Sequence, residues 1–101
     1  VNVPNKGYIP NLPEGAIVEV HAYTGEKDLE PQVVPPMEDR LAGIMRLQIR
    51  IQDLVVDAAL NKSPETAYEA LLLDPLSPVD RDACRRLFDQ MYNMQKEHLP
   101  F

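Results

Sequence analysis

Two adjacent prolines, Pro35 and Pro36, divide this sequence into two parts with different hydrophobic periods. Before the pair, apolar and polar residues alternate in the manner of a strand, whereas beyond it apolar residues recur at the roughly 3.6-residue spacing of a helix. Proline lacks a backbone N–H and restricts the residue before it to extended backbone, so neither element continues through the pair. We therefore expect an α+β chain, with a loop and a β-hairpin in residues 1–36 and helices in residues 37–101.

The hairpin is predicted from residues 16–34. Residues 16–23, AIVEVHAY, alternate as a half-buried strand does, and the TGEK sequence at 24–27 is typical of a turn. LEPQVV at 29–34 is the expected returning strand, which Pro31 restricts to a sheet edge. Val18, Val20 and Ala22 are expected on one face of the first strand, and Ile17, Glu19, His21 and Tyr23 on the other.

The stretch NKGYIPNLPEG at residues 5–15 predicts a loop of fixed shape. It has too many glycines and prolines for a strand, and too many large apolar residues for a flexible linker. Gly7 and Gly15 permit positive φ angles. The amides of Asn5 and Asn11 either close their own turns or present a hydrogen-bonding group to a ligand.

One long and two shorter helices are expected after the prolines. The long helix covers residues 37–60. Ser63 and Ser77 are each followed by proline, so we expect both to be N-caps, with the second helix ending ahead of Pro75 and the third closed by Pro100. The predicted apolar face of the long helix consists of Met37, Leu41, Ile44, Ile51, Val55 and Ala59.

The apolar arc of this long helix is wider than a surface helix needs, which favours cover from a second copy or from chain outside these residues. Gln48 lies near the centre of the arc. A buried amide needs partners, so we expect Gln48 either to brace the neighbouring 5–15 loop or to reach a ligand. The opposite stripe is polar and consists of Arg46, Arg50, Asp53 and Asp57.

Charge and cysteine content exclude several classes of protein. The formal net charge of −6 argues against a nucleic-acid partner and against an anionic membrane surface. No apolar run is long enough to span a bilayer. Cys84 is alone, which favours a reducing, cytoplasmic location. The sequence begins at Val1 rather than Met, which is expected of part of a longer protein.

No catalytic, cofactor-binding or metal-binding residue is assigned from these residues. His21 and His98 are far apart and belong to no cluster with metal-ligand spacing. Cys84 has the spacing of a packed helix residue, and no glycine-rich phosphate loop is present.

Three segments together resemble the C-terminal part of glycoside hydrolase family 4. They are VNVPNKGYIPNLPEGAIVEV, IQDLVVDAALNKS and ALLLDPLSP, in this order and spacing. The combination is specific although each piece alone is weak, and His21 departs from the proline more common at that position in the family.

The resemblance implies a fold, a reaction and cofactors. Full-length members have a Rossmann NAD domain followed by an α/β domain similar to those of lactate and malate dehydrogenases, and residues 1–101 are the C-terminal segment of that substrate domain. Bound NAD oxidises the C3 hydroxyl of the sugar, the aglycone is eliminated, water adds and the hydride returns, with Mn²⁺ polarising the C2 and C3 oxygens. The family's dinucleotide fingerprint, metal ligands and base have no matching positions here, so we expect neither cofactor nor activity on this segment alone.

The resemblance also implies where a sugar binds. It places the 5–15 loop close to the sugar pocket, which makes Asn5, Asn11 and Gln48 the candidate substrate-binding residues. A homo-oligomer is expected from the wide apolar arc. Two alternatives stay open: a helical self-association or interaction module, and the substrate domain of a lactate- or malate-type dehydrogenase.

Overall fold

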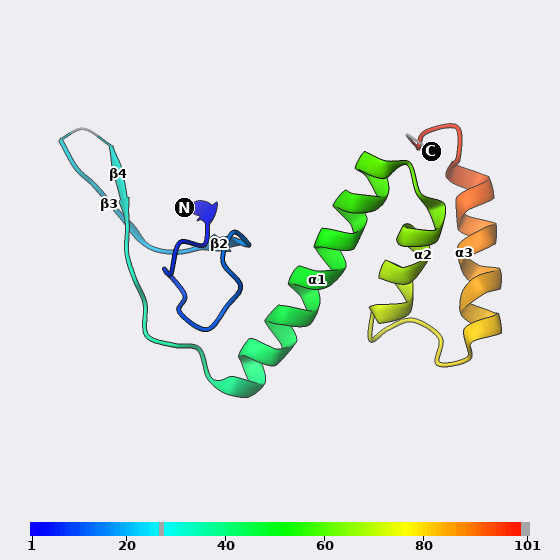
Figure 1. Ribbon diagram of the computed structural model, residues 1–101, viewed down its shortest axis with the longest axis horizontal. Coiled ribbons are helices and arrows are strands. Elements are labelled where there is room, and N and C mark those ends of the chain that lie inside the picture. Colours follow the sequence, from blue (N-terminus) through cyan, green and yellow to red (C-terminus); the bar gives the residue numbers. More distant parts are fainter. Residues whose placement is uncertain (27, 100–101) are drawn as a thin grey trace. The chain divides into compact units, whose positions relative to one another are not determined.

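The computed structural model describes residues 1–26 and 28–99 (Figure 1). Two β-hairpins are followed by three helices, which is the expected α+β class. The chain divides into two compact units, Val1–Arg46 and Leu47–Phe101. This division falls inside the first helix.

The first hairpin joins the beginning of the chain to the segment after the 5–15 loop. Strand β1 (Asn2–Pro4) pairs antiparallel with β2 (Ile17–Glu19), so that Val3 lies opposite Val18. The sequence did not predict β1, because three residues that end in proline carry no alternation signal. The 5–15 loop is therefore the connection of a hairpin, with both of its ends held by a strand pair.

The second hairpin pairs β3 (Ala22–Thr24) with β4 (Leu29–Pro31). The prediction of one strand over 16–23 was wrong, because the segment changes partners after Val20: the Val20 N–H donates to Val1 O, whereas His21 O accepts from the Gln32 N–H. Lys27, in the predicted turn, lies outside the described residues. The predicted alternation is confirmed, since Val18 and Val20 are buried while their neighbours Ile17, Glu19 and His21 are exposed.

The predicted long helix is confirmed as α1 (Asp39–Asn61). Its buried residues are Ala42, Leu54 and Ala58, whereas Ile44 and Val55, two members of the predicted apolar face, are exposed. This exposure agrees with the expectation that the arc needs cover from a second copy or from chain outside these residues, and that cover stays a prediction. A wide apolar arc gives no sign of which part of it is covered.

Helices α2 (Pro64–Leu73) and α3 (Arg81–Gln95) run antiparallel, side by side (Figure 1). Ser63 caps α2 as predicted, with its Oγ accepting from the Thr66 N–H. The prediction that Ser77 is the N-cap of α3 was wrong.

Asp80 caps α3 instead, accepting from the N–H groups of Asp82 and Ala83. The Ser77 hydroxyl donates to the Leu71 carbonyl at 2.5 Å, and this carbonyl at the end of α2 also accepts from the Asp74 N–H at 3.2 Å. Pro100, the predicted end of the last helix, lies outside the described residues.

Candidate functional site

Asn5 is the hydrogen-bonding centre of the loop between β1 and β2. Its side chain is 1% exposed, and its Nδ2 donates to the carbonyl oxygens of Ile9, Leu12 and Pro13 at 3.0, 3.1 and 3.2 Å. Its Oδ1 accepts from the Ile9 N–H at 3.1 Å. An amide group has two N–H donors, so three carbonyls share them and the loop itself satisfies the whole side chain.

The backbone at both ends of the loop is also fixed. The Asn5 N–H donates to Ala16 O at 2.7 Å, and the Gly15 N–H donates to Asn5 O at 2.8 Å. Gly7 and Gly15 have φ angles of 85° and 81°. This left-handed region costs a residue with a side chain roughly 1–2 kcal/mol, so the predicted use of both glycines for positive φ is confirmed.

The segment 34–46 fastens the loop from outside. Asn11 pairs with the backbone of Met37, accepting from its N–H at 2.8 Å and donating to its carbonyl at 2.7 Å. The Arg46 Nη2 donates to Asn11 O at 2.8 Å. The Val34 N–H donates to Tyr8 O, also at 2.8 Å. The loop therefore has a single shape, held by contacts distant in sequence.

These contacts decide how the predicted site residues are used in the structure. The Asn5 side chain closes its own loop, which is the turn-closing alternative, whereas the Asn11 side chain bonds the backbone of Met37, 26 positions away. Gln48 is exposed on α1, and no hydrogen bond of its side chain occurs within residues 1–26 and 28–99, so its expected burial was wrong there. The bracing expected of Gln48 comes from Arg46. Direct contact of Asn5, Asn11 or Gln48 with a sugar stays a prediction.

Sequence reasoning missed Arg46 because the helical period placed it on the polar stripe, which is normally a solvated face. No local pattern connects it with Asn11, since the two residues are separated by 35 positions. The composition of the loop was the available signal. A rigid loop of eleven residues with buried apolar side chains needs contacts with a neighbouring element.

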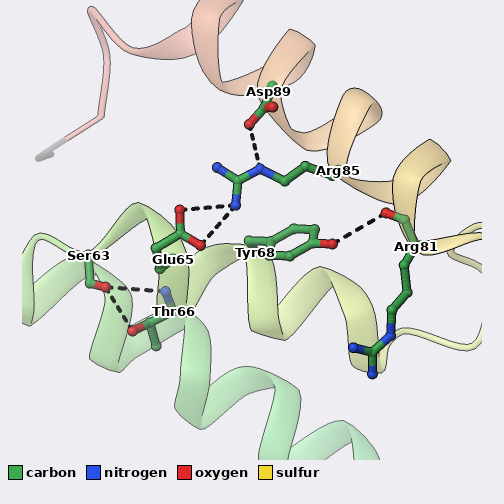
Figure 2. Close-up of polar contacts among 7 residues, drawn as sticks. All are labelled: Ser63, Glu65, Thr66, Tyr68, Arg81, Arg85 and Asp89. Carbon is green, nitrogen blue, oxygen red and sulfur yellow. Dashed lines mark hydrogen bonds and ion pairs between the residues drawn. The ribbon is translucent and has the colours of Figure 1, made fainter.

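A second cluster of polar and aromatic side chains joins α2 to α3 (Figure 2). The Arg85 Nη1 donates to both carboxylate oxygens of Glu65, at 2.8 and 3.0 Å, and the Arg85 Nε lies 2.9 Å from Asp89 Oδ1. The guanidinium carbon also lies 4.8 Å from the ring centroid of Tyr68 and 5.6 Å from that of Phe88. Arg85 thus contacts carboxylates and aromatic rings of both helices. We call this set of contacts the clasp.

The hydrogen bond from Arg85 is expected to affect the pKa of Glu65. The hydrogen bond from Arg85 holds the pKa of Glu65 below its ordinary value of 4.5. Replacing Arg85 by glutamine is expected to return this pKa to about the ordinary value, which an NMR titration of the side-chain carboxyl measures. Because the folded-state pKa is depressed, the stabilisation is complete above the unfolded-state value and disappears as pH falls through the folded-state value.

The matched control is Arg86→Gln, which removes an exposed neighbouring charge of the same helix. An Arg85→Gln protein whose Glu65 titrates as in the wild type would contradict the clasp. So would an equal change of the Glu65 pKa in the control.

Two hollows open on the unit that contains α2 and α3. The first has a volume of about 570 Å³. It is lined by Arg50 and Arg81 and also by Glu69 and Asp74, so the formal charges of its lining cancel. The second, of about 450 Å³, is an apolar groove. The side chains that line this apolar groove include Ile51, Val55, Ala58, Ala70, Leu71, Phe88, Met91 and Leu99.

The described part of the chain contains no gathering of three or more His, Cys, Asp or Glu side chains able to hold a metal ion. Cys84 is fully buried in α3 with a free thiol, which confirms its expected packing role. No helix in residues 1–26 and 28–99 has the length and apolarity needed to cross a membrane.

Residues 1–77 match the model of the family 4 glycosyl hydrolase C-terminal domain. The chain belongs to family 4 of the glycosyl hydrolases. It is 35% identical over 91 residues to an alpha-galacturonidase of Bacillus subtilis (strain 168), an alignment that covers 90% of this chain and 20% of the relative. It is 36% identical over 103 residues to an alpha-glucosidase of Erwinia rhapontici, covering 100% of this chain and 22% of the relative.

Solved structures of family 4 glycosidases contain the same arrangement of elements. A 6-phospho-alpha-glucosidase from gut microorganisms, crystallised with NAD and glucose-6-phosphate, superposes with a TM-score of 0.87 at 31% identity, over 99% of this chain and 22% of that one. A second 6-phospho-alpha-glucosidase structure, with NAD and Mn²⁺, gives a TM-score of 0.86 at 29% identity, over 99% of this chain and 23% of that one. The chain therefore spans about a fifth of the length of its family 4 relatives.

Proposed function

We propose that this family 4 chain forms the C-terminal part of a glycosidase that hydrolyses α-glycosidic bonds of the α-glucosidase or α-galactosidase type. The observation that carries the proposal is the superposition of 99% of the chain on a 6-phospho-alpha-glucosidase at 31% identity. Relatives with named activities, among them the alpha-glucosidase of Erwinia rhapontici, support the same class. The family match removes the support for a lactate- or malate-type dehydrogenase.

For the full-length protein we propose NAD-dependent oxidation, elimination, addition and reduction with Mn²⁺, in the cytoplasm. Support comes from the two neighbouring structures, which contain NAD and Mn²⁺. The residues described here do not fit either group, because they have no glycine-rich phosphate loop and no gathered metal ligands. No step of the reaction is therefore assigned to them.

The part we assign to this chain is a rigid border of the sugar site, formed by the 5–15 loop. Support comes from the hydrogen bonds that give the loop one shape while Lys6 and Pro10 stay exposed. Binding residues are often carried on loops that a rigid scaffold positions. In this role the side chains of Asn5 and Asn11 fix the conformation of the loop backbone, and the exposed side chains of the loop face the ligand.

We also propose that the protein is a homo-oligomer. Support comes from the exposed apolar side chains of α1 and from the apolar groove of about 450 Å³. Exposed apolar patches of this kind are typical of interaction sites.

The test is an assay of the full-length protein on nitrophenyl α-glycosides, with and without a 6-phosphate, in the presence of NAD and Mn²⁺. We expect hydrolysis of at least one α-glycoside, its loss when either cofactor is omitted, and no hydrolysis by the isolated 101 residues. Light scattering on the same preparation is expected to give a mass above that of one chain. Hydrolysis that continues without NAD would contradict the proposed reaction, and a single-chain mass would contradict the oligomer.

A further inference from the structure

Arg46 has an unusual place among the contacts that fasten the 5–15 loop. The other two external contacts, Asn11 with Met37 and Tyr8 with Val34, are made by the extended segment before α1. Arg46 is the residue that reaches the loop from the helix itself, with its Nη2 2.8 Å from Asn11 O. It therefore connects the loop to the first turns of α1, which belong to the same compact unit.

This hydrogen bond affects the position of the Asn11 carbonyl more than the folding free energy. Arg46 is exposed, and exposed charged groups contribute little to folding because water competes for them. The guanidinium group is planar and presents its donors in a fixed arrangement, so the accepting carbonyl is held at a defined distance and direction. Asn11 O belongs to the peptide between Asn11 and Leu12, and the Leu12 side chain is buried. A change at Arg46 thus removes the hydrogen bond to the Asn11 carbonyl, while the Asn11 side chain stays bonded to Met37 and the Leu12 side chain stays buried.

We infer that Arg46 is a positioning residue for substrate binding, acting through the carbonyl of Asn11 on the shape of the 5–15 loop. The inference rests on the proposed function, in which this loop borders the sugar site. Arg46 is not a catalytic residue, since it acts on the loop and not on the sugar.

The experiment compares three variants of the full-length protein in steady-state kinetics and thermal unfolding. Arg46→Ala removes the hydrogen bond. Arg46→Lys keeps the charge and one donor on a shorter, more flexible side chain. Arg50→Ala is the matched control, because Arg50 is an exposed arginine one turn later on α1 and has no hydrogen bond to the loop.

We expect Arg46→Ala to raise KM about fivefold and to change kcat less than about twofold, because an element that binds the ground state and the transition state equally affects KM alone. Arg46→Lys is expected to have an intermediate KM, and Arg50→Ala the wild-type KM. The melting temperatures of the two alanine variants are expected to agree.

Three results would overturn the inference. The first is an Arg46→Ala KM equal to that of Arg50→Ala. The second is a lower melting temperature of Arg46→Ala without a change in KM, which indicates a structural role only. If Arg46→Ala does not fold, the third is a wild-type KM in Arg46→Lys although amide hydrogen exchange shows that the loop is disturbed. A wild-type protein without glycosidase activity would remove the proposed function and this inference with it, whereas an active wild type with unaffected variants removes the inference alone.

Discussion

Replacing Asn5 by aspartate is expected to lower the free energy of unfolding of the first unit by about 3 kcal/mol, the cost of leaving buried polar groups without partners. The substitution preserves the shape of the side chain but removes both Nδ2 donors. The carbonyl oxygens of Ile9, Leu12 and Pro13 then face a carboxyl oxygen in place of an N–H group. With Asn5 only 1% exposed, water cannot replace the lost donors without opening the loop.

Amide hydrogen exchange measures this loss where it occurs. The N–H groups of Ile9 and Gly15 are both hydrogen-bonded to Asn5 and report on the closed loop. We expect both to exchange much faster in Asn5→Asp. Asn93→Asp, the same change at an exposed position of α3, is expected to leave them unaffected. Wild-type protection of the two amides in Asn5→Asp would show that Asn5 is not the centre of the loop.

The second large effect is expected from Leu54→Ala, which should destabilise the helical unit by about 3 kcal/mol through lost burial and the cavity that remains. Leu54 is 5% exposed and is the largest buried side chain of α1. Urea unfolding followed by far-UV circular dichroism measures the change, because this unit is mostly helical.

Leu60→Ala provides a control with the same chemistry on the same helix. Leu60 is 76% exposed, so its truncation is expected to change the unfolding free energy by less than about 0.5 kcal/mol, as is usual at the surface. Equal effects of the two substitutions would mean that the buried face of α1 is not the one containing Leu54.

Local signals in the sequence predicted the elements well where one residue decides the structure. Ser63 followed by Pro64 begins α2, Gly7 and Gly15 take positive φ, and the alternation around Val18 gives the buried side of the strand. In each case the deciding interaction lies within a few residues, so the pattern contains the physical cause.

The predictions that failed depend on competition between partners. Ser77 has the pattern of an N-cap, but its hydroxyl donates to the Leu71 carbonyl at the end of α2, and Asp80 caps α3 instead. One extended segment became two strands because Val20 and His21 find different partners. The bracing of the loop was assigned to Gln48 because the helical period describes faces of a helix, whereas the contact of Arg46 with Asn11 depends on the path of the chain between them.

The hydrogen bonds around Asn5 have a consequence for engineering. The backbone of the 5–15 loop depends on two amide side chains, two glycines and a set of peptide groups, and none of these is the exposed Lys6 or Glu14. Those two positions can be varied in charge, size and hydrogen-bonding capacity on a backbone that keeps its course. A library randomised at residues 6 and 14 would therefore exchange the chemistry of the loop surface while the loop itself serves as a constant frame.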